Sequence, residues 1–226
     1  MLCDCHSHKI SENKICLCSL NFKEWKKNQL LKNNFTKCSY GIHPCYLDKN
    51  EIDNLYSLLK SNPEKIDAIG EIGLDYFNNT LIETKKLQKF FFEMQLDFAI
   101  EFNKPIIIHC RKAVNDILYF SSKLKKISSV IFHEYWGTVV EANYLLKRGV
   151  NAFFSFGSSI LKGRKKSIEC VKHFSLDFLF AETDSPFQNT KLIDVYNEIS
   201  KLKNMSLEIV EKNIENNFNN VFSVHL

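Results

Sequence analysis

The sequence contains no pair of cysteines separated by two residues, although it has eight cysteines among its 226 residues. Because zinc ribbons and thioredoxin-like redox sites are built on such pairs, neither is supported. A disulfide scaffold is not expected either, since the chain is long and 45% hydrophobic. We expect most of the thiols to be small buried groups, and Cys110, which directly follows a histidine, to be the one that could take part in a site.

Long apolar runs are also absent. The most apolar windows, PIIIHC and FLFAET, are too short to span a bilayer. The N-terminus lacks the basic stretch and apolar run of a signal peptide. We therefore expect a cytoplasmic protein with no membrane partner. Its net charge of +4 permits an acidic partner but does not require one.

Linkers and internal repeats are missing as well. The chain has only seven glycines and four prolines, and no segment is rich in either or in serine. We therefore expect a single domain that spans residues 1–226. Within it, short runs of β-forming apolar residues indicate strands of a buried parallel sheet. They lie at residues 1–5, 14–19, 37–42, 66–72, 105–110, 129–132, 151–156 and 177–181.

Helical periodicity separates most of these strands. Apolar side chains recur at helical spacing in residues 87–98, 139–146 and 207–221, and Gly149 stands where a helix cap is expected. Strands that alternate with helices predict an α/β fold of the (β/α)8 TIM barrel type. The first connection is the exception, because only residues 9–13 separate the first strand and its two histidines from the second. A parallel crossover normally takes a dozen or more residues, so we expect the barrel to be distorted at this corner.

Side chains able to bind metal or move a proton follow the strands of this barrel. The stretch DCHSH places two histidines at i and i+2, which point the same way from a strand. Because the C-terminal ends of all strands open on one face of a parallel barrel, we expect the whole set to meet there. The set comprises His6 and His8 after the first strand, His43 after the third, Glu71 and then Asp75 at the end of the fourth, His109 at the end of the fifth, His133 after the sixth, and Glu182 and Asp184 after the eighth.

Any one of these histidines could be an ordinary structural residue. As a group they are harder to explain in that way, because buried ionisable side chains are costly unless they are paired or metal-bound. Four imidazoles and two carboxylates suffice for two divalent ions, with Glu71 as the natural bridge between them. Two ions roughly 3.5–4 Å apart can orient a water, lower its pKa and stabilise charge on phosphorus. The pattern therefore predicts a hydrolase.

The motifs that carry these residues resemble the TatD family of metal-dependent deoxyribonucleases, within the amidohydrolase-like hydrolases. The tail IVEKNIENNFNNVF is similar to the closing helix of that family. GEIGLDY and ETDSP are the most specific of the matching motifs. In the family's order, the matching stretches are DCHSH, GIHP, GEIGLDY, QLDFAIEFNKPIIIHCR, FHEYWG, GVNAFFSFG and LFAETDSPF.

The resemblance implies a distorted barrel that hydrolyses phosphodiester bonds and trims DNA from a 3′ end with two Mg²⁺ ions, or with Mn²⁺ or Zn²⁺. Glu71 would bridge the ions, and Asp184 would bind one of them and accept the proton of the attacking water. Glu182 would fix a loop or a ligand histidine. The expected partners are single-stranded or frayed DNA ends, with no obligate protein partner. By position, the implied metal ligands are His6, His8, Glu71, His109, His133 and Asp184.

Substrate contacts are expected from further residues near the same face. His43 would lie close to a phosphate oxygen, and Arg111 could either fork onto a phosphate or make a surface ion pair. Tyr135 and Trp136 depart from the family's usual Phe-Ser-Gly or Phe-Arg-Gly and could stack on a base or close the barrel. The basic residues 162–166 could bind phosphate or only begin a solvated helix. Since no long basic stripe is present, a short strand end is a better substrate than a duplex.

Two other functions stay open. A related hydrolase could cleave an ester, amide or lactone, such as an aminoacyl ester on tRNA, because the same activated water attacks carbon or phosphorus. A non-catalytic binding protein on an enzyme scaffold would show broken ligands, and none is broken here. The basic residues at positions 111, 112 and 162–166 favour a phosphate substrate.

Overall fold

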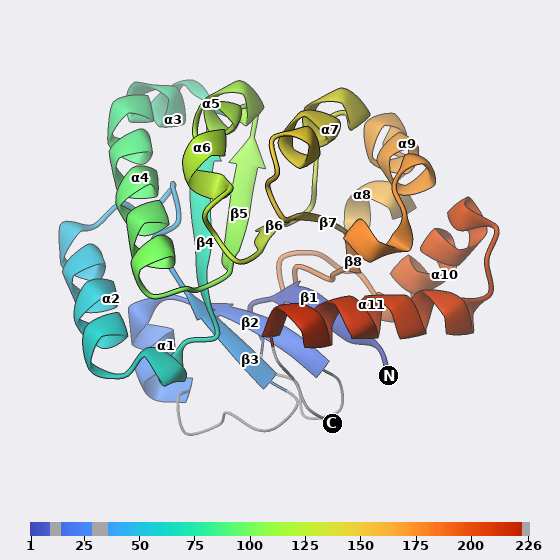
Figure 1. Cartoon of the computed structure of the whole chain (residues 1–226), viewed down its shortest axis with the longest axis horizontal. Coiled ribbons are helices and arrows are strands. Elements are labelled where there is room, and N and C mark those ends of the chain that lie inside the picture. Colours follow the sequence, from blue (N-terminus) through green and yellow to red (C-terminus); the bar gives the residue numbers. More distant parts are fainter. Residues whose placement is uncertain (10–14, 29–35, 223–226) are drawn as a thin grey trace.

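The computed structural model describes residues 1–9, 15–28 and 36–222. Its parallel strands pair in sequence order, in one sheet that curls into a nearly closed barrel (Figure 1). The α/β barrel and all of the predicted strands are thereby confirmed. The strands are β1 (Cys3–Ser7), β2 (Ile15–Leu20), β3 (Thr36–Tyr40), β4 (Ala68–Asp75), β5 (Ile106–Arg111), β6 (Val130–Phe132), β7 (Ala152–Phe156) and β8 (Leu179–Ala181).

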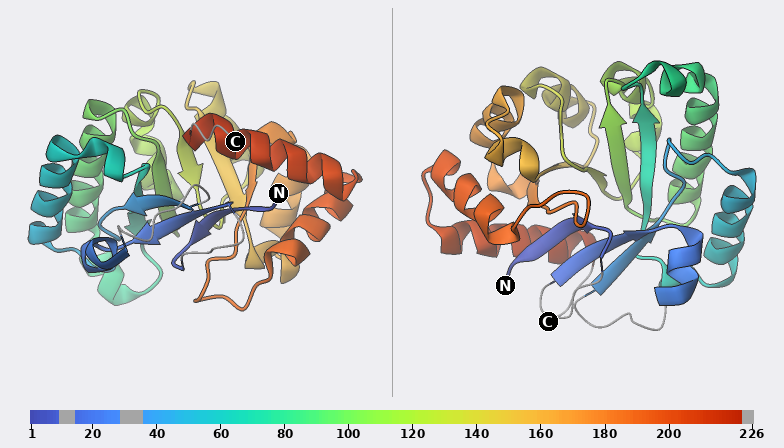
Figure 2. Two further views of the ribbon diagram at one scale, coloured as in Figure 1. Left: turned by 90° about the horizontal axis from the view of Figure 1, so that it is seen from below. Right: turned by 180° about the vertical axis from the view of Figure 1, so that it is seen from behind.

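Helices lie on the outer side of the sheet, as the views from below and behind show (Figure 2). None of the helices in residues 1–9, 15–28 and 36–222 combines the length and the apolar character needed to cross a bilayer. The helices are α1 (Phe22–Asn28), α2 (Lys49–Ser61), α3 (Asn79–Glu83), α4 (Lys85–Glu101), α5 (Val114–Tyr119), α6 (Ser121–Leu124), α7 (Val139–Lys147), α8 (Ser158–Leu161), α9 (Lys165–His173), α10 (Leu192–Lys203) and α11 (Leu207–Phe222), with short 3-10 turns at Pro63–Lys65 and Leu176–Phe178.

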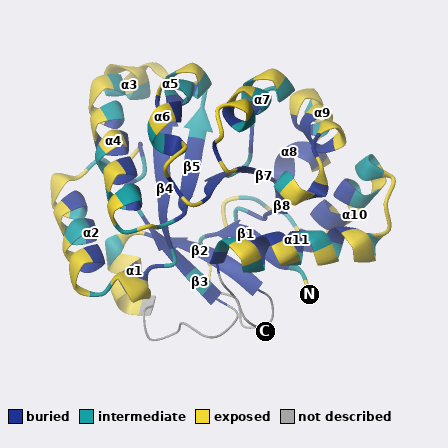
Figure 3. Cartoon of the chain, viewed as in Figure 1, coloured by how far each residue is buried: buried dark blue, intermediate teal, exposed yellow. Residues whose placement is uncertain are grey.

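The strands are the most buried part of the molecule, and the helices expose only their outer faces (Figure 3). The closing helix α11 buries Val210, Ile214 and Phe218 completely, as its apolar spacing predicted. Gly149 follows α7 with a φ of +79°, a left-handed conformation that favours glycine. The cysteines are all free, and they are buried apart from exposed Cys45 and half-buried Cys110. Most of them therefore serve as small core residues.

The predicted distortion lies at the first connection of the barrel. β1 ends at Ser7 and β2 begins at Ile15, yet the two strands pair in parallel. Their register shifts between Asp4 and Ser7. Residues 10–14, where most of this connection runs, lie outside the described residues. The irregular stretch of β1 contains His6, so the distortion falls on the strand that carries the histidine pair.

Backbone and side-chain hydrogen bonds join the end of β8 to β1 and close the barrel. The Asp184 amide donates to the His6 carbonyl at 3.0 Å. One residue earlier, the Thr183 amide and hydroxyl donate to the two carboxylate oxygens of Asp4 at 2.9 and 2.7 Å. Asp4 is fully buried. We call this set of contacts the barrel seam.

Removal of the Asp4 carboxylate should weaken the seam. We expect Asp4→Ala to lower the free energy of unfolding by about 2–4 kcal/mol, because it leaves two buried donors of Thr183 without an acceptor. Thr183→Val removes only the hydroxyl and should cost about 1–2 kcal/mol. Since the two residues are in contact, the double mutant should cost less than the sum of the single mutants. Urea unfolding measures all three values, and strictly additive costs would contradict the coupling.

Candidate active site

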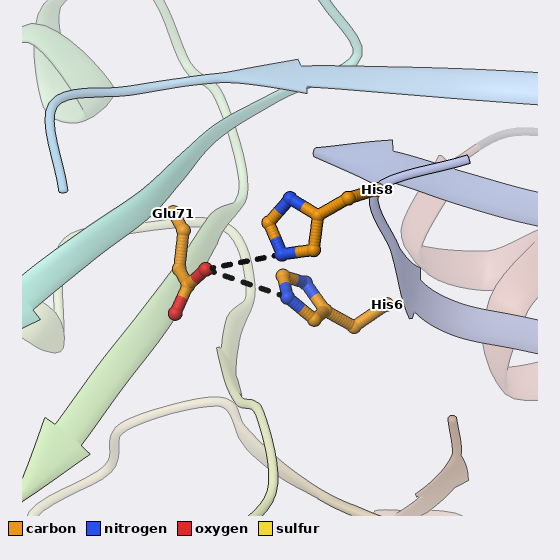
Figure 4. A group of neighbouring side chains, drawn as sticks. All are labelled: His6, His8 and Glu71. Atoms are coloured by element: carbon orange, nitrogen blue, oxygen red, sulfur yellow. Dashed lines mark ion pairs between the residues drawn. The ribbon is translucent and has the colours of Figure 1, made fainter. Parts of the chain in front are cut away.

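Imidazoles and carboxylates from β1, β4, β5 and the segments after β6 and β8 gather at the C-terminal mouth of the barrel. Figure 4 shows His6 and His8 reaching from the end of β1 toward Glu71. The two histidines point the same way because side chains two apart share one face of a strand. The structure brings together all six predicted ligands, namely His6, His8, Glu71, His109, His133 and Asp184.

One oxygen of Glu71 faces the histidines of the middle strands. Oε1 lies 2.7 Å from both His109 Nδ1 and His133 Nε2, and 3.5 Å from His43 Nε2. His43, which was predicted to lie near the ligands, is therefore in contact with the same carboxylate. The side chain of Glu71 is only 8% exposed, so these imidazoles replace most of its water.

The other oxygen of Glu71 faces β1. Oε2 lies 3.4 Å from His6 Nε2 and 3.7 Å from His8 Nε2. Asp184, in the segment after β8, approaches the same two rings. Its Oδ1 lies 3.7 Å from His6 Nε2 and 3.6 Å from His8 Nε2. The HxH pair thus lies between two carboxylates, one from β4 and one from the segment after β8.

The prediction that Glu71 ends the fourth strand is wrong, because β4 continues to Asp75. Two glycines in GEIGLDY weaken the strand pattern in the sequence. The structure shows why the second of them, Gly73, has to be a glycine. Gly73 has a φ of +144°, and a Cβ there would clash with the backbone oxygen of His109. The ladder from β4 to β5 is irregular between Ile69 and Ile72, the stretch that carries Glu71.

Two further carboxylates orient the outer nitrogens of the central histidines. Asp75 Oδ2 is 2.9 Å from His109 Nε2, so the Nδ1 atom of that ring points at Glu71. Glu182 Oε1 is 3.3 Å from His133 Nδ1 and also accepts the backbone amide of Glu134 at 3.0 Å. Such carboxylate partners fix the ring orientation and raise the basicity of metal-binding histidines.

Burial and charge compete at each of these groups. Burial would raise the pKa of Glu71, but the neighbouring imidazoles, His133 and His43 above all, outweigh it and hold the pKa well below its usual range. Burial lowers the pKa of His6 to about 4, helped by the charge of His133. Burial also raises the pKa of Glu182 to about 7, although His133 opposes it. The mouth therefore contains an ionised carboxylate, Glu71, beside a neutral imidazole, His6.

A divalent metal fits this donor set. His6 is fully buried, and neither of its ring nitrogens makes a hydrogen bond within the described part of the chain. Its Nε2 has only the two carboxylate contacts at 3.4 and 3.7 Å. An unpartnered buried polar group is costly, and coordination would supply the missing contact. The imidazoles suit Zn²⁺, and the carboxylates suit Mg²⁺ and Mn²⁺. Ligand atoms within 4.8 Å of one another form the groups His6–His8–Glu71, His6–His133–Asp184 and His43–Glu71–His109.

All members of the cluster except the fully buried His6 line a cavity of about 620 Å³ at the barrel mouth. Two exposed aromatic rings stand at this cavity, Tyr46 at 79% and Phe187 at 71% exposure. The ring of Phe187 packs edge-on against His8 at 4.9 Å, and the ring of Tyr46 lies 5.8 Å from His43. Each aromatic ring therefore sits beside a histidine that contacts Glu71.

The remaining predicted residues lie apart from this cavity. Tyr135 is 2% exposed and its hydroxyl donates to the Thr138 carbonyl, which favours the barrel-closing alternative over base stacking. Trp136 lines a neighbouring cavity. Arg111 pairs with Asp75 at 3.6 Å and lies over the ring of Trp136. Burial raises the pKa of Cys110 to about 12, so its thiol stays protonated and is a poor metal ligand.

Several residues of the site were not assigned a role from the sequence. Asp75 was noted beyond Glu71, but its contact with His109 was not foreseen, although GEIGLDY and IIIHCR are adjacent strands. Tyr46 and Phe187 each follow a polar site residue by three positions, His43 and Asp184. That spacing is a weak signal, because most aromatic residues near a strand end belong to the core.

The chain matches the profile of a known protein family over nearly its whole length. The profile of the family described as TatD related DNase matches residues 5–223. The chain belongs to the TatD family. It is accordingly a metal-dependent hydrolase that acts on ester bonds.

Relatives of the TatD family match most of the chain. A protein of Buchnera aphidicola subsp. Baizongia pistaciae named as a metal-dependent hydrolase is 32% identical over 217 residues, 91% of this chain and 78% of its own. A protein of Enterocytozoon bieneusi, whose name includes deoxyribonuclease and TATDN1 homolog, is 34% identical over 171 residues, 70% of this chain and 58% of its own. The crystal structure of YJJV, a TatD homolog from Escherichia coli K12, superposes with a TM-score of 0.85 at 18% identity and covers 99% of this chain and 98% of its own.

The contact between Asp75 and His109 should control metal affinity. We expect Asp75→Asn to weaken Zn²⁺ binding by about 10–100-fold, because the neutral amide no longer raises the basicity of the imidazole. Calorimetric titration of the metal-stripped protein measures this effect. Asp97→Asn is the matched control, since the side chain of Asp97 is 57% exposed and pairs with Lys123. Equal affinity in Asp75→Asn and the control would contradict the role of Asp75.

Proposed function

We propose that this chain is a two-metal phosphodiesterase that removes nucleotides from the 3′ ends of single-stranded or frayed DNA. The observation that carries the proposal is the contact of Glu71 with the imidazoles of the barrel mouth, with Asp184 beside His6 and His8. The description of the family as TatD related DNase and the name of the Enterocytozoon bieneusi relative support DNA as the substrate class.

The ligand set divides around Glu71. We expect Mg²⁺, with Mn²⁺ or Zn²⁺ as alternatives. When bound, the ions would activate water and neutralise the charge that builds on the phosphate. One ion would be held by His6, His8 and Asp184 and the other by His109 and His133, with Glu71 shared between them.

Residues around the ligands would act on protons and on the phosphate. Asp184 would accept the proton of the attacking water, because its carboxylate lines the cavity and faces the two histidines of β1. His43, which lines the same cavity, would contact a phosphate oxygen. Arg111 would contact the substrate beside the neighbouring cavity, where its guanidinium lies over the ring of Trp136. Glu182 would hold His133 in place through Nδ1.

The exposed rings of Tyr46 and Phe187 favour a nucleic acid over a small ester or lactone. A base can stack on either ring without displacing protein, and such stacking tolerates any sequence. It also requires unpaired bases, which a single-stranded or frayed end supplies. The two rings therefore support an unpaired DNA end as the substrate. They do not bear on whether digestion starts at the 3′ or the 5′ end.

The assignment of Asp184 and Glu71 is tested with labelled single-stranded DNA and Mg²⁺, Mn²⁺ or Zn²⁺. We expect a 5′-labelled strand to shorten stepwise and a 3′-labelled strand to release its label as a mononucleotide. Asp184→Asn should lower kcat by about 10²–10⁴-fold, the usual contribution of a general base. Glu71→Gln should abolish turnover, since it removes the charge shared by both ions.

The control for these variants is Asp194→Asn, an exposed carboxylate in the first turn of α10. It should match the wild type in turnover, and circular dichroism should show all three variants folded. Full activity of either Asp184→Asn or Glu71→Gln would refute the assignment. Cleavage of an aminoacyl ester, with no cleavage of DNA, would favour the related hydrolase instead.

The two rings at the mouth should set the affinity for DNA. Tyr46→Ala and Phe187→Ala should each raise KM for single-stranded DNA by about 5–150-fold, which corresponds to a stacking energy of about 1–3 kcal/mol per base. Tyr46→Phe keeps the ring and should behave as the wild type. Tyr119→Ala is the control, because Tyr119 is 81% exposed and lines neither cavity. Steady-state kinetics that show an unchanged KM in both alanine variants would exclude stacking.

A further inference from the structure

A second cavity, of about 420 Å³, shares the lining residue His133 with the first. Its walls come mainly from the segments that follow β5 and β6, with further residues from the end of β4 and the starts of α4 and α9. We call it the basic cavity, after the cations that line it, which are Lys85, Lys112, Arg164 and Lys166. The proposed mechanism uses none of these four residues.

The carboxylates of the basic cavity already have partners. Asp116 binds Lys85 at 2.8 Å and Lys89 at 2.7 Å. Glu141 accepts the amide and hydroxyl of Thr138 at 2.6 and 2.7 Å, as the capping box of α7. Among the described residues that line the cavity, no acid therefore remains to neutralise the other cations.

Three cations in the basic cavity remain without a carboxylate partner. Among residues 1–9, 15–28 and 36–222, no ion pair joins Lys112, Arg164 or Lys166 to an acid. Lys112 instead donates to the Phe77 carbonyl at 3.3 Å and lies over the ring of that residue. Three uncompensated cations around one cavity attract an anion.

The first turn of α9 adds to this positive field. The helix runs from Lys165 to His173, and its N-cap, Arg164, makes no side-chain capping bond. The first amides of a helix have no acceptor within the helix and carry the positive end of its dipole. Because Arg164 and Lys166 line the cavity, this uncapped turn lies at its wall, where it favours phosphate.

Trp136 organises the cations rather than offering a face to a base. The guanidinium carbon of Arg164 lies 3.8 Å from the centroid of its ring, and that of Arg111 lies at 5.2 Å. Arg111 also lies over Phe77 at 4.0 Å. Stacking with an aromatic ring holds a guanidinium while it leaves the N–H groups free to donate. A base could stack on Trp136 only by competing with these arginines.

We propose that the basic cavity is a subsite for an internucleotide phosphate of a single-stranded nucleic acid, with Trp136 as the residue that positions Arg164. The inference rests on the proposed function, which identifies the bound strand as DNA. A neighbouring phosphodiester of the same strand would then reach Glu71 and Asp184. Arg164 and Lys166 bind the phosphate oxygens, and the amides of the first turn of α9 add further donors. The strand passes the wall formed by His133 as it runs from one cavity to the other.

The first test measures binding without turnover. Fluorescence polarisation of labelled hexathymidylate is recorded against salt concentration in EDTA. Arg164→Ala/Lys166→Ala should weaken binding and reduce the slope of log K against log salt by about 1.4, because each lost phosphate contact on a single strand contributes about 0.7. Trp136→Ala should shift the slope in the same direction, and Trp136→Phe, which keeps a ring, should restore it.

The control is Lys126→Ala/Lys147→Ala, which removes two exposed lysines before the N-terminal ends of β6 and β7, at the opposite end of the barrel. Its slope should equal that of the wild type. If Arg164→Ala/Lys166→Ala and the control give the same slope and affinity, the subsite is overturned.

The second test separates this inference from the proposed function. With a divalent ion, Arg164→Ala/Lys166→Ala should raise KM for hexathymidylate but leave hydrolysis of thymidine 5′-(p-nitrophenyl phosphate), which has a single phosphodiester, unchanged. Loss of the salt slope in a protein that hydrolyses neither substrate would support the subsite and refute the phosphodiesterase. Equal losses on both substrates would overturn the subsite, because the cations would then serve the reacting phosphate.

Discussion

The structure depends on one buried carboxylate, Glu71, and on the imidazoles that surround it. A carboxylate taken out of water is several kcal/mol less stable unless charges or donors replace the solvent. Here the replacement comes from histidines of β1 and β5 and of the segments that follow β3 and β6, all within 3.7 Å of its two oxygens. None of these elements can supply the contact alone. The barrel mouth is therefore a place where separate strands satisfy one charge, and the same arrangement offers ligand atoms to a metal.

The fold serves this arrangement through its two irregular places. β1 changes register beside β2 at the stretch that contains His6, and β4 is irregular beside β5 at the stretch that contains Glu71. Irregular pairing of this kind redirects a side chain that a regular strand would place elsewhere. The barrel seam then brings Asp184 against His6 through a backbone hydrogen bond. Regular strands bury the core, and the departures from regularity aim the functional side chains.

Much of this could be predicted from the sequence because a parallel barrel collects the C-terminal ends of its strands on one face. Once each histidine or carboxylate was placed at a strand end, the convergence of His6, His109 and Asp184 followed. Spacing does not tell which way a side chain points after the strand ends. Tyr135 turns into the core although it neighbours His133 by two residues, and Tyr46 turns out to solvent. Partners such as Asp4 with Thr183 lie far apart in sequence, so no local pattern could reveal them.

The barrel seam also fixes when a working enzyme can first exist. Asp4 and Thr183 are 179 positions apart, and Asp184 comes still later in the chain. A chain that emerges from the ribosome N-terminus first must hold β1 without its seam partner until residues 183 and 184 have been made. Contacts with so large a sequence separation form late and slowly. The nascent polypeptide therefore carries the HxH pair long before Asp184 reaches it, so the ligand set is incomplete until the barrel seam has closed.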